Sequence, residues 1–428
     1  LLPFFFLPPF SSFSSSSSSS FFLFPPSFLP PPPWFVFDIL MFFSFNIGAN
    51  RVQKGFPWYF QDMLEEDANF QLMQDLGFTV VRLGFMWSGY NPHPNYFNGT
   101  YIEIIKTIIG KFNNHGIYVL LDMHQDGLSS KFCLYDGAPL WVIDKSMPKH
   151  EFPWPLTGNC SRNWEMNELT EACGKAYQDL YDNHDGMLDD LASFWGHAAA
   201  EFKDIPGIIG YEIMNEPFAG DFYADPLILV PGIAGKTNLQ KMHDAVAKEI
   251  RKHDETHAIF FEPVTWGMIF DSKIVGSGFD HVPGGVEYSN RSVLSYHYYC
   301  ASFLPGWEGQ PMWTKAVCDD VVGPLVFEAV TKDVQGFGGG RMMTEGMACG
   351  DRTESECQTV MADLDKRMLS WTDYGDSQGP EFLPSSKQQL SWSRTHARAI
   401  SGTPLNMSFD PTTKDFEFYF EPNVAIKH

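Results

Sequence analysis

The sequence is poor in basic residues, and its first 37 residues carry no charge of either sign. The chain of 428 residues has 29 Lys and Arg against 52 Asp and Glu, which gives a formal net charge of −23. Binding along a run of phosphates requires concentrated Lys and Arg, so we expect no nucleic-acid partner. The same deficit argues against electrostatic docking on an anionic membrane.

Long apolar runs and metal-binding cysteine pairs are also missing. No stretch reaches the ~18 uninterrupted apolar residues of a membrane span. The seven cysteines form no pair of CxxC motifs and no Cys/His set, so we expect no zinc site, no other metal and no cofactor. Cys349 and Cys357 lie eight residues apart. They are predicted to be bridged in an oxidising compartment, with buried free thiols as the alternative.

Residues 1–37 consist mainly of Phe, Pro, Ser and Leu, with an unbroken serine run at 14–20. A signal peptide would open with Met, a basic segment and a continuous apolar core. We predict a disordered low-complexity leader, with a degraded signal segment as the alternative. Four Asn-X-Ser/Thr sequons occur elsewhere, at Asn98, Asn159, Asn290 and Asn406. They favour the secretory route, so we expect a secreted or lysosomal glycoprotein.

From about residue 40, apolar runs of strand length alternate with amphipathic stretches. Strands are predicted at 42–48, 78–86, 117–124, 208–216, 258–264, 293–299, 341–345 and 369–374. Helices are predicted at 65–76, 101–114, 188–202, 239–253, 354–368 and 387–400. About eight such βα units predict a (β/α)₈ barrel, assigned to residues 38–402, with a doubly wound sheet as the alternative.

Two segments depart from the βα alternation. The connection at 127–186 is predicted to be a long structureless loop that holds Trp141, Trp154 and Trp164. Loops of that length are usually functional, so we expect it to form a substrate wall, with an inert insertion as the alternative. The tail at 403–428 alternates like a β-hairpin that turns at Asp410-Pro411.

Polar residues gather where the predicted strands end, which favours the barrel over the open sheet. They are Arg82, His124, Asp126, Asn215, Glu216, His297, Tyr299 and Glu345. The carboxyl ends of parallel strands face one mouth in a barrel, whereas in an open sheet they spread along an edge.

Glu216 and Glu345 are the candidate catalytic pair. Glycoside hydrolysis needs one carboxyl group to protonate the leaving oxygen and another to attack or to activate water. A nearby carboxylate and partial burial would keep Glu216 protonated, while Arg82 and Tyr299 would hold Glu345 ionised. Asn-Glu-Pro by itself also suits a strand end that runs into a turn, so the prediction depends on the whole series of strand ends.

Longer segments strengthen this interpretation. They are RVQKGFPWYF (51–60), GFTVVRLGFMW (77–87), GIYVLLDMHQD (116–126) with KFC (131–133), IMNEP (213–217), SYHYY (295–299) and SRTHARAISGTPLNMSFDP (393–411). Together they resemble the (β/α)₈ retaining glycosidases that include cellulases and β-mannanases, glycoside hydrolase family 5, and within them the endoglycoceramidases. The resemblance covers roughly 42–428. Family members end in a β-sandwich, of which 403–428 would be the beginning.

The resemblance implies a retaining hydrolase that cleaves the bond between oligosaccharide and ceramide in glycosphingolipids. Glu216 would be the acid/base and Glu345 the nucleophile. Arg82, His297 and Tyr299 would orient and charge-tune Glu345. Such a substrate would bring the protein into transient contact with a membrane or micelle surface, and the sequence leaves the oligomeric state open.

The resemblance also implies sugar contacts. Asn215 would hold the 2-hydroxyl, and His124 would contact the −1 sugar. Lys54, Asp122 and Asp126 would contact the sugar next to the lipid or its neighbour. For Asp122 a structural partner of a neighbouring strand end is the alternative, and for Lys54 a solvated loop cation.

Three positions depart from the family pattern. The first strand reads Ile-Gly-Ala-Asn at 47–50 where members usually have His-Gly-x-Asn. Gly346 follows Glu345, where an aromatic is usual. The last strand has Trp371 and then Tyr374, not the second Trp that stacks under the sugar, so Tyr374 would be a weaker platform and Trp371 a core residue.

Two other functions stay open. A polysaccharide such as a β-glucan or mannan would use the same chemistry in an open aromatic cleft. A glycolipid-binding protein without turnover would keep only the binding site.

Overall fold

A computed structural model describes residues 45–423, except 66, 134–136, 159, 161–164, 265–267, 271–272, 300–316, 348, 350–353, 376–380 and 399. The predicted leader at 1–37, the sequon at Asn159 and Trp164 lie outside the described residues. None of the described helices combines the length and apolar character that crossing a bilayer requires.

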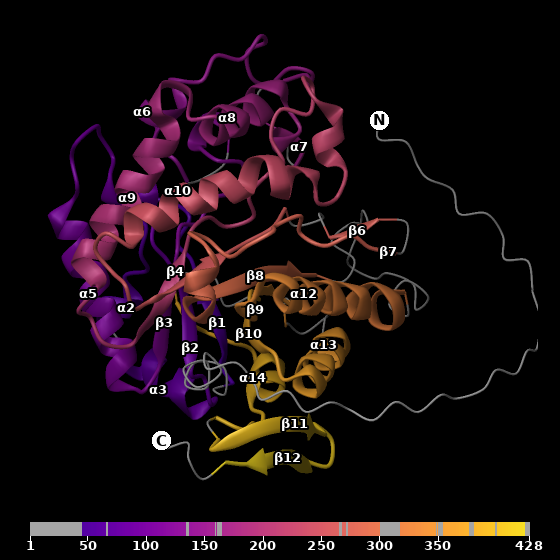
Figure 1. Cartoon of the computed structure of the whole chain (residues 1–428). Helices are drawn as coiled ribbons and strands as arrows, with labels where there is room; N and C mark the ends of the chain where they lie inside the picture. Colours follow the sequence, from indigo (N-terminus) through magenta and orange to yellow (C-terminus); the bar gives the residue numbers. More distant parts are fainter. Residues whose placement is uncertain are drawn as a thin grey trace, which may run out of the picture. The chain divides into compact units, whose positions relative to one another are not determined.

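Eight parallel strands close into a barrel (Figure 1). They are β1 (Ile47–Arg51), β2 (Val80–Gly84), β3 (Tyr118–Asp122), β4 (Ile208–Glu212), β5 (Ala258–Phe261), β8 (Ser292–Tyr298), β9 (Gly340–Gly346) and β10 (Ser370–Asp373). The ring is closed because β1 pairs with both β2 and β10. The predicted (β/α)₈ fold is confirmed, and the doubly wound alternative is excluded.

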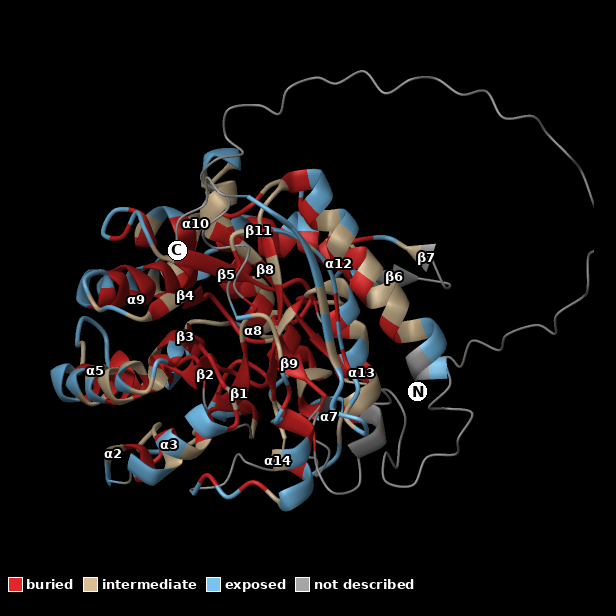
Figure 2. Cartoon of the chain, turned by 90° about the horizontal axis from the view of Figure 1, so that it is seen from below, coloured by how far each residue is buried: buried red, intermediate tan, exposed pale blue. Residues whose placement is uncertain are grey.

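Helices surround the strands, with their buried sides toward the barrel (Figure 2). Those that follow the predicted pattern are α3 (Asp67–Asp75), α5 (Gly99–Asn114), α9 (Met187–Phe202), α10 (Gln240–Ile250) and α13 (Glu354–Arg367). The pattern missed α12 (Gly323–Phe337), although Phe327, Val330 and Val334 follow helical spacing and are buried. Short helices at the strand ends are α2 (Asp62–Glu65) and α4 (Trp87–Tyr90).

The prediction of a helix at 387–400 is wrong in its second half. The helix α14 (Ser386–Trp392) ends at Trp392, whose indole donates a hydrogen bond to Asp373 Oδ2 at 3.1 Å. Arg394 then forms a buried ion pair with Asp365 on α13. These two anchors turn the chain inward, which a continued helix would not allow.

The prediction that the connection at 127–186 is structureless is wrong. It contains α6 (Leu140–Ile143), α7 (Glu165–Glu168) and α8 (Glu171–Tyr181), and α9 begins directly after it. Much of α8 is buried, and its Tyr177 hydroxyl lies 2.5 Å from Gln125 Oε1 at the end of β3.

Disulfides join Cys133 to Cys160 and Cys349 to Cys357. The second was predicted and the first was not. Cys173 of α8 is a buried free thiol.

Outside the barrel are two small antiparallel pairs. One is β6 (Ile269–Phe270) with β7 (Lys273–Ile274). The other is β11 (Gly402–Phe409) with β12 (Phe416–Pro422), which confirms the predicted hairpin. Phe418 of this hairpin contacts Phe45 edge-on, with ring centroids 6.4 Å apart.

The barrel interior has two layers that differ in chemistry. The lower layer, toward the strand N-termini, is apolar and consists of Val80, Leu120, Ala258, Phe260 and Met342. Alternate residues of a strand point to the same side. Two residues further along β2, β3 and β5 the same face therefore presents Arg82, Asp122 and Glu262, which begin the charged upper layer.

Candidate active site

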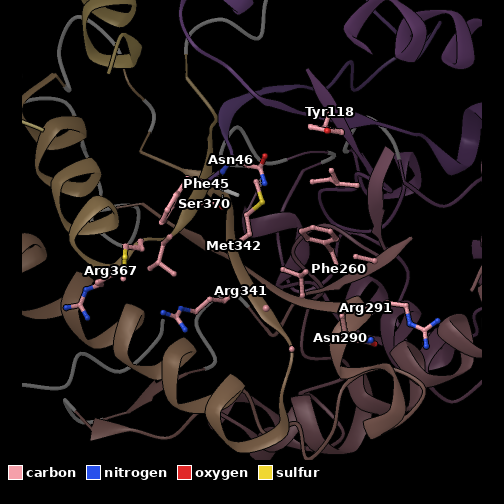
Figure 3. A pocket seen from close by; sticks show the side chains of 18 of the residues that line it. Phe45, Asn46, Tyr118, Phe260, Asn290, Arg291, Arg341, Met342, Arg367 and Ser370 are labelled. Atoms are coloured by element: carbon pink, nitrogen blue, oxygen red, sulfur yellow. Dashed lines mark hydrogen bonds between the residues drawn. The ribbon is translucent and has the colours of Figure 1, made fainter. Parts of the chain in front are cut away.

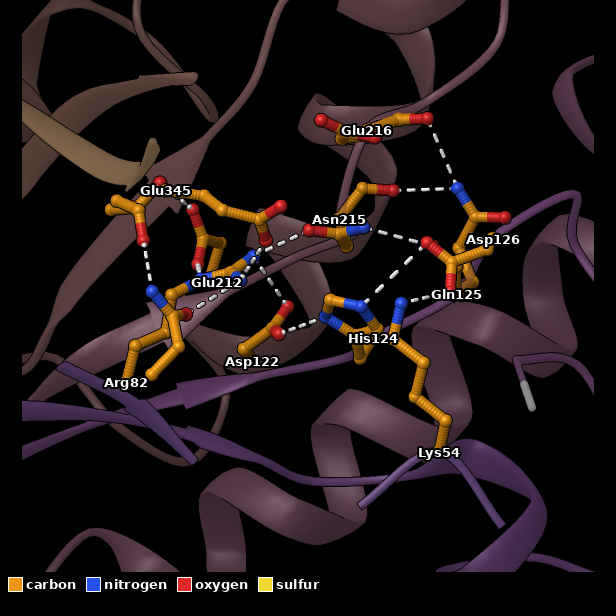
Figure 4. A network of polar contacts seen from close by, with 12 residues as sticks. Lys54, Arg82, Asp122, His124, Gln125, Asp126, Glu212, Asn215, Glu216 and Glu345 are labelled. Atoms are coloured by element: carbon orange, nitrogen blue, oxygen red, sulfur yellow. Dashed lines mark hydrogen bonds and ion pairs between the residues drawn. The ribbon is translucent and has the colours of Figure 1, made fainter. Parts of the chain in front are cut away.

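The barrel brings the two predicted carboxylates together at the C-terminal ends of its strands (Figure 4). Glu216 follows β4, and Glu345 lies in β9. A carboxylate oxygen of each and a ring nitrogen of His297 all lie within 4.8 Å of one another. This spacing is near the ~5–5.5 Å typical of retaining glycosidases and well short of the roughly 6.5–9.5 Å of inverting ones.

Glu345 is held by two donors. Arg82 Nη1 lies 3.0 Å from its Oε2, and the Tyr299 hydroxyl donates to its Oε1 at 2.7 Å. Burial raises the pKa of Glu345, while His297, Arg82 and Lys54 act in the opposite direction. The predicted donors are therefore in place, but burial outweighs them, and the net shift is upward.

Arg82 is the centre of the charged layer and is fully buried. Its guanidinium lies 2.5 Å from Glu212, 3.0 Å from Asp122 and 3.0 Å from Glu345, with Glu262 at 3.7 Å. Burial alone would lower the pKa of Arg82, yet these four carboxylates raise it well above its usual value. One fixed positive charge thus faces four acidic groups, so the layer must also hold protons.

Glu216 has a different environment. Its φ of 39° is in the left-handed region, a strained backbone for a residue with a side chain. Its side chain is 22% exposed, against 10% for Glu345. Its Oε1 lies 2.7 Å from Nδ1 of His297.

The prediction that His297 orients Glu345 is therefore corrected, because its hydrogen bond is to Glu216. The predicted effect of His297 on the charge of Glu345 agrees with the structure, in which His297 lowers the pKa of Glu345. The pairing of β8 with β9 shifts register between Tyr296 and His297, so that His297 is paired with Glu345 along the backbone. Burial lowers the pKa of His297, which favours the neutral imidazole.

Asn215, with Asp122 at the end of β3 and His124 just beyond it, forms the floor beside the pair. The Asn215 amide accepts from Arg82 Nη2 at 2.8 Å and donates to the Gln125 carbonyl at 2.9 Å. His124 is buried, and its Nδ1 lies 2.7 Å from Asp122 Oδ2. Burial raises the pKa of Asp122 to about 6, opposed by Arg82. Asp122 is fully buried between Arg82 and His124. Its placement is therefore that of a structural partner of the neighbouring strand end, the alternative to a sugar contact.

Lys54 and Asp126 form one edge of the site. Lys54 Nζ lies 2.5 Å from Asp126 Oδ2 and 5.4 Å from the ring centroid of Tyr374. This pairing makes Lys54 part of the site and not a solvated loop cation. The Tyr374 ring lies parallel to that of His124, with centroids 6.2 Å apart. Tyr374 thus lies beside His124, while Trp371 is buried in the core as predicted.

Gly346, which replaces the usual aromatic, has a steric explanation. Its φ is 153°, and a Cβ added there would lie 2.4 Å from the carbonyl oxygen of Tyr298. No side chain fits on this backbone. The conformation of Gly346 and the nearby Tyr298 carbonyl therefore exclude the aromatic residue that the family pattern has after Glu345.

Sequence reasoning missed three residues of the site. Glu212 accepts from Arg82 and from the Thr344 hydroxyl, and Glu262 accepts from the Glu216 backbone N–H at 3.3 Å. Gln125 donates to the Glu216 carbonyl at 3.0 Å. A usable signal existed for both acids, because each interrupts an apolar strand that was predicted to be buried.

Two groups satisfy a distance criterion for metal ligands. Glu212, Glu262 and His297 form one, and His297 with the catalytic pair forms the other. Both lie beside the buried guanidinium of Arg82, whose charge would repel a cation. The ion pairs with Arg82 and the hydrogen bond from His297 to Glu216 account for the contacts within these groups, and we assign no metal ligand.

A separate cavity of about 580 Å³ lies at the other end of the barrel (Figure 3). It is lined by residues at the strand N-termini, among them Tyr118, Phe260, Arg341 and Met342. None of the predicted site residues lines it. The cavity is therefore distinct from the carboxylate site.

Comparison with known proteins matches residues 43–372 to the cellulase family, glycosyl hydrolase family 5. The endoglycoceramidase of Hydra vulgaris is 38% identical and is aligned over 89% of this chain and 75% of its own length. The endoglycoceramidase of Cyanea nozakii is 36% identical, over 87% of this chain and 77% of its own length. Endo-glycoceramidase II from Rhodococcus sp., solved as a ganglioside GM3 complex, has the same fold, with a TM-score of 0.71 at 18% identity over 90% of this chain and 86% of that chain. The chain is a glycoside hydrolase that belongs to glycosyl hydrolase family 5, and within that family it is similar to the endoglycoceramidases, as its motifs predicted.

Proposed function

We propose that this protein hydrolyses the β-linkage between the oligosaccharide and the ceramide of glycosphingolipids, with retention of configuration. The similar proteins of Hydra vulgaris and Cyanea nozakii are endoglycoceramidases, which supports the substrate class. The geometric observation that carries the reaction type is the pair of Glu216 and Glu345, with oxygens within 4.8 Å.

The partners of the two carboxylates assign their roles. Glu345 accepts from Arg82 and Tyr299 on the charged layer, which favours an ionised nucleophile. Glu216 is more exposed and pairs with the imidazole of His297, which suits a group that gains and loses a proton. Glu345 would attack the anomeric carbon while Glu216 protonates the leaving oxygen. Glu216 would then take a proton from the water that releases the sugar.

The surrounding polar groups would fix the sugars. Asn215, which Arg82 holds beside the pair, would bind the 2-hydroxyl, and His124 with the adjacent Tyr374 would contact the −1 sugar. Lys54 and Asp126 extend the site toward the next sugar. The connection at 127–186, packed on the end of β3 through Tyr177, would supply the wall for the lipid.

The test is product analysis on lactosylceramide in detergent micelles. We expect wild-type protein to release intact lactose and ceramide, and Glu345→Gln to release neither. Release of single sugars only would contradict the substrate assignment. Hydrolysis of a β-glucan or mannan in preference to the glycolipid would favour the polysaccharide alternative. Binding of glycolipid micelles without any hydrolysis by wild type would favour the non-catalytic alternative.

We further propose that the protein follows the secretory route and is glycosylated. Two disulfides among the described residues suit an oxidising compartment. Asn406 is exposed on β11, so its sequon is accessible to a glycan. Expression in a eukaryotic cell should yield medium-borne protein whose mass falls on treatment with an N-glycosidase. Protein that stays in the cell with reduced cysteines would contradict this route.

A further inference from the structure

Glu262, which follows β5 in the charged layer, has no role in the mechanism described so far. Its side chain is buried, and its Oε2 accepts from the backbone N–H of Glu216 at 3.3 Å. Its Oε1 lies 3.3 Å from Nε2 of His297. Among the described residues, neither of these two atoms has a hydrogen-bond partner, because their own approach at 3.3 Å lacks hydrogen-bond geometry. Arg82 Nη2 also approaches Oε1, at 3.7 Å.

Unpartnered polar atoms in a protein interior are costly, and a small rotation of either side chain would place a hydrogen bond between these two, which satisfies both. The opposite nitrogen of the same ring, Nδ1, lies 2.7 Å from Oε1 of Glu216. The imidazole of His297 therefore bridges two carboxyl groups, one at the reaction centre and one buried behind it. A neutral imidazole carries one hydrogen, which must point to one of the two.

We propose that Glu262 is a positioning residue for the general acid: through His297 it shares one proton with Glu216 and so sets the protonation of the acid/base. This deepens the proposed function and rests on it. In one state Glu216 is protonated and donates to Nδ1, while Nε2–H donates to an ionised Glu262. In the other, Nδ1 has taken the proton of Glu216 while Nε2 has given its hydrogen to Glu262. One O–H and one N–H bond break and one of each forms, with no net charge on the ring.

Both end states are accessible to the groups present. Burial raises the pKa of Glu262 well above its usual value, so this carboxyl can hold the proton, and burial lowers the pKa of His297, so the ring stays neutral. The charged groups that face Glu262 are Arg82 from β2, Asp122 from β3, Glu212 from β4 and Glu216 beyond it, and His297 from β8. From α10, His243 Nε2 lies 3.0 Å from the Glu262 carbonyl oxygen and does not contact the carboxyl.

Glu262→Gln tests the shared proton, because the substitution should favour one of the two tautomers of His297. The Glu216 N–H requires an oxygen acceptor, so the amide oxygen should take that place and its NH₂ should face Nε2 of His297. That arrangement forces the hydrogen of the ring onto Nδ1, where it donates to Glu216 and stabilises its carboxylate. The alkaline limb of the kcat/KM profile should therefore move to lower pH by about one unit.

The choice of leaving group separates this effect from a general structural defect. On lactosylceramide, whose leaving alkoxide needs a proton, Glu262→Gln should lose about tenfold or more at neutral pH. On 2,4-dinitrophenyl β-lactoside, whose leaving group needs none, the rate of the first step should stay within about threefold of wild type. Loss that is equal on both substrates, with an unmoved alkaline limb, would overturn the proposal.

Glu212→Gln is the matched control. Glu212 is an equally buried acid of the same layer, but its hydrogen bonds are to Arg82 and Thr344 and not to the ring of His297. Its substitution should affect both substrates alike and leave the alkaline limb in place. An alkaline shift in this control as large as in Glu262→Gln would contradict a path through His297. Wild-type protein inactive on both lactosides would instead refute the proposed function itself.

The wild-type ring gives a second test that does not depend on a variant folding. With ¹⁵N-labelled histidine, assigned by comparison with His297→Gln, both ring nitrogens of His297 should show shifts between those of the two pure tautomers near neutral pH. A single fixed tautomer across the whole activity range would rule out the shared proton.

Discussion

The two layers inside the barrel are made by the same strands, yet they have opposite chemistry. Leu120 and Phe260 of the lower layer are fully buried among other apolar side chains. Asp122 and Glu262, two residues further along the same strands, are equally buried but charged or protonated. Apolar burial stabilises a barrel, whereas burial of acids has a cost that only pairing reduces.

This difference indicates a division of labour. The lower layer supplies the stability that allows four carboxylates to surround one arginine in the upper layer. Substitutions in the lower layer should therefore change the free energy of unfolding and leave kcat unchanged. Substitutions in the upper layer should lower kcat, with or without a change in the free energy of unfolding. The predictions that follow test that separation, beginning with the largest expected effect.

Glu345→Gln should separate activity from stability most clearly. Loss of the nucleophile should reduce kcat on lactosylceramide by about 10⁴-fold or more. Because burial raises the pKa of Glu345, its charged form is disfavoured in the fold, and the neutral amide should leave the Tm at or above that of wild type. A large fall in Tm with retained activity would contradict this assignment, because Glu345 would then serve stability and not catalysis.

Arg82→Met should damage both properties, because it leaves four buried acids without their shared cation. We expect a loss of about 3–5 kcal/mol in the free energy of unfolding at neutral pH. Burial already raises the pKa values of Asp122, Glu262 and Glu345, and loss of the guanidinium would raise them further above their unfolded values. The variant should thus be most stable at low pH and lose stability as pH rises through the folded values. Urea unfolding at pH 5 and pH 8 measures this slope, with Arg82→Lys as the charge-preserving control.

Leu120→Ala in the lower layer is the opposite case. It should destabilise the protein by about 3 kcal/mol through lost burial and a residual cavity. The kcat of the folded fraction should remain within about twofold, because Leu120 contacts no residue of the carboxylate pair among the contacts described. Chemical unfolding and kinetics on the aryl lactoside, measured on the same preparation, distinguish the two quantities. A tenfold loss of kcat at full folding would break the separation between layers.

The sequence predicted the apolar layer and the catalytic pair better than the partners of that pair. Strand alternation and the ends of the strands placed Glu216, Glu345 and Arg82 at one mouth, and the structure has them there. It did not predict that His297 hydrogen-bonds to Glu216, because the direction of a side chain at a strand end depends on the residues around it and leaves no mark on its own strand.

Other misses have similar physical causes. Glu262 was overlooked because a single acid in an apolar run gives no indication of its partner, which arrives from β8. The link between Cys133 and Cys160 depends on how an irregular connection folds back, and spacing does not determine that. α8 was missed because the length of the connection and its tryptophans indicated a loop, although the apolar positions of α8 are those of a buried helix.

Tyr299→Phe is the smallest change and the finest test of the upper layer. It removes one hydroxyl, which donates to Glu345 Oε1 at 2.7 Å, and leaves the ring in place. A hydrogen bond to a charged acceptor contributes about 1.5–3 kcal/mol, so kcat/KM should fall by roughly tenfold to a hundredfold. The nucleophile acts only when ionised, and loss of a donor to the carboxylate raises the pKa of Glu345 further. Activity disappears as pH falls through that pKa, so the acid limb of the profile should move to higher pH while the alkaline limb stays in place. Glu262→Gln should move the alkaline limb alone, and a Tyr299→Phe profile displaced on the alkaline side would show that the two carboxylates do not have the separate partners described here.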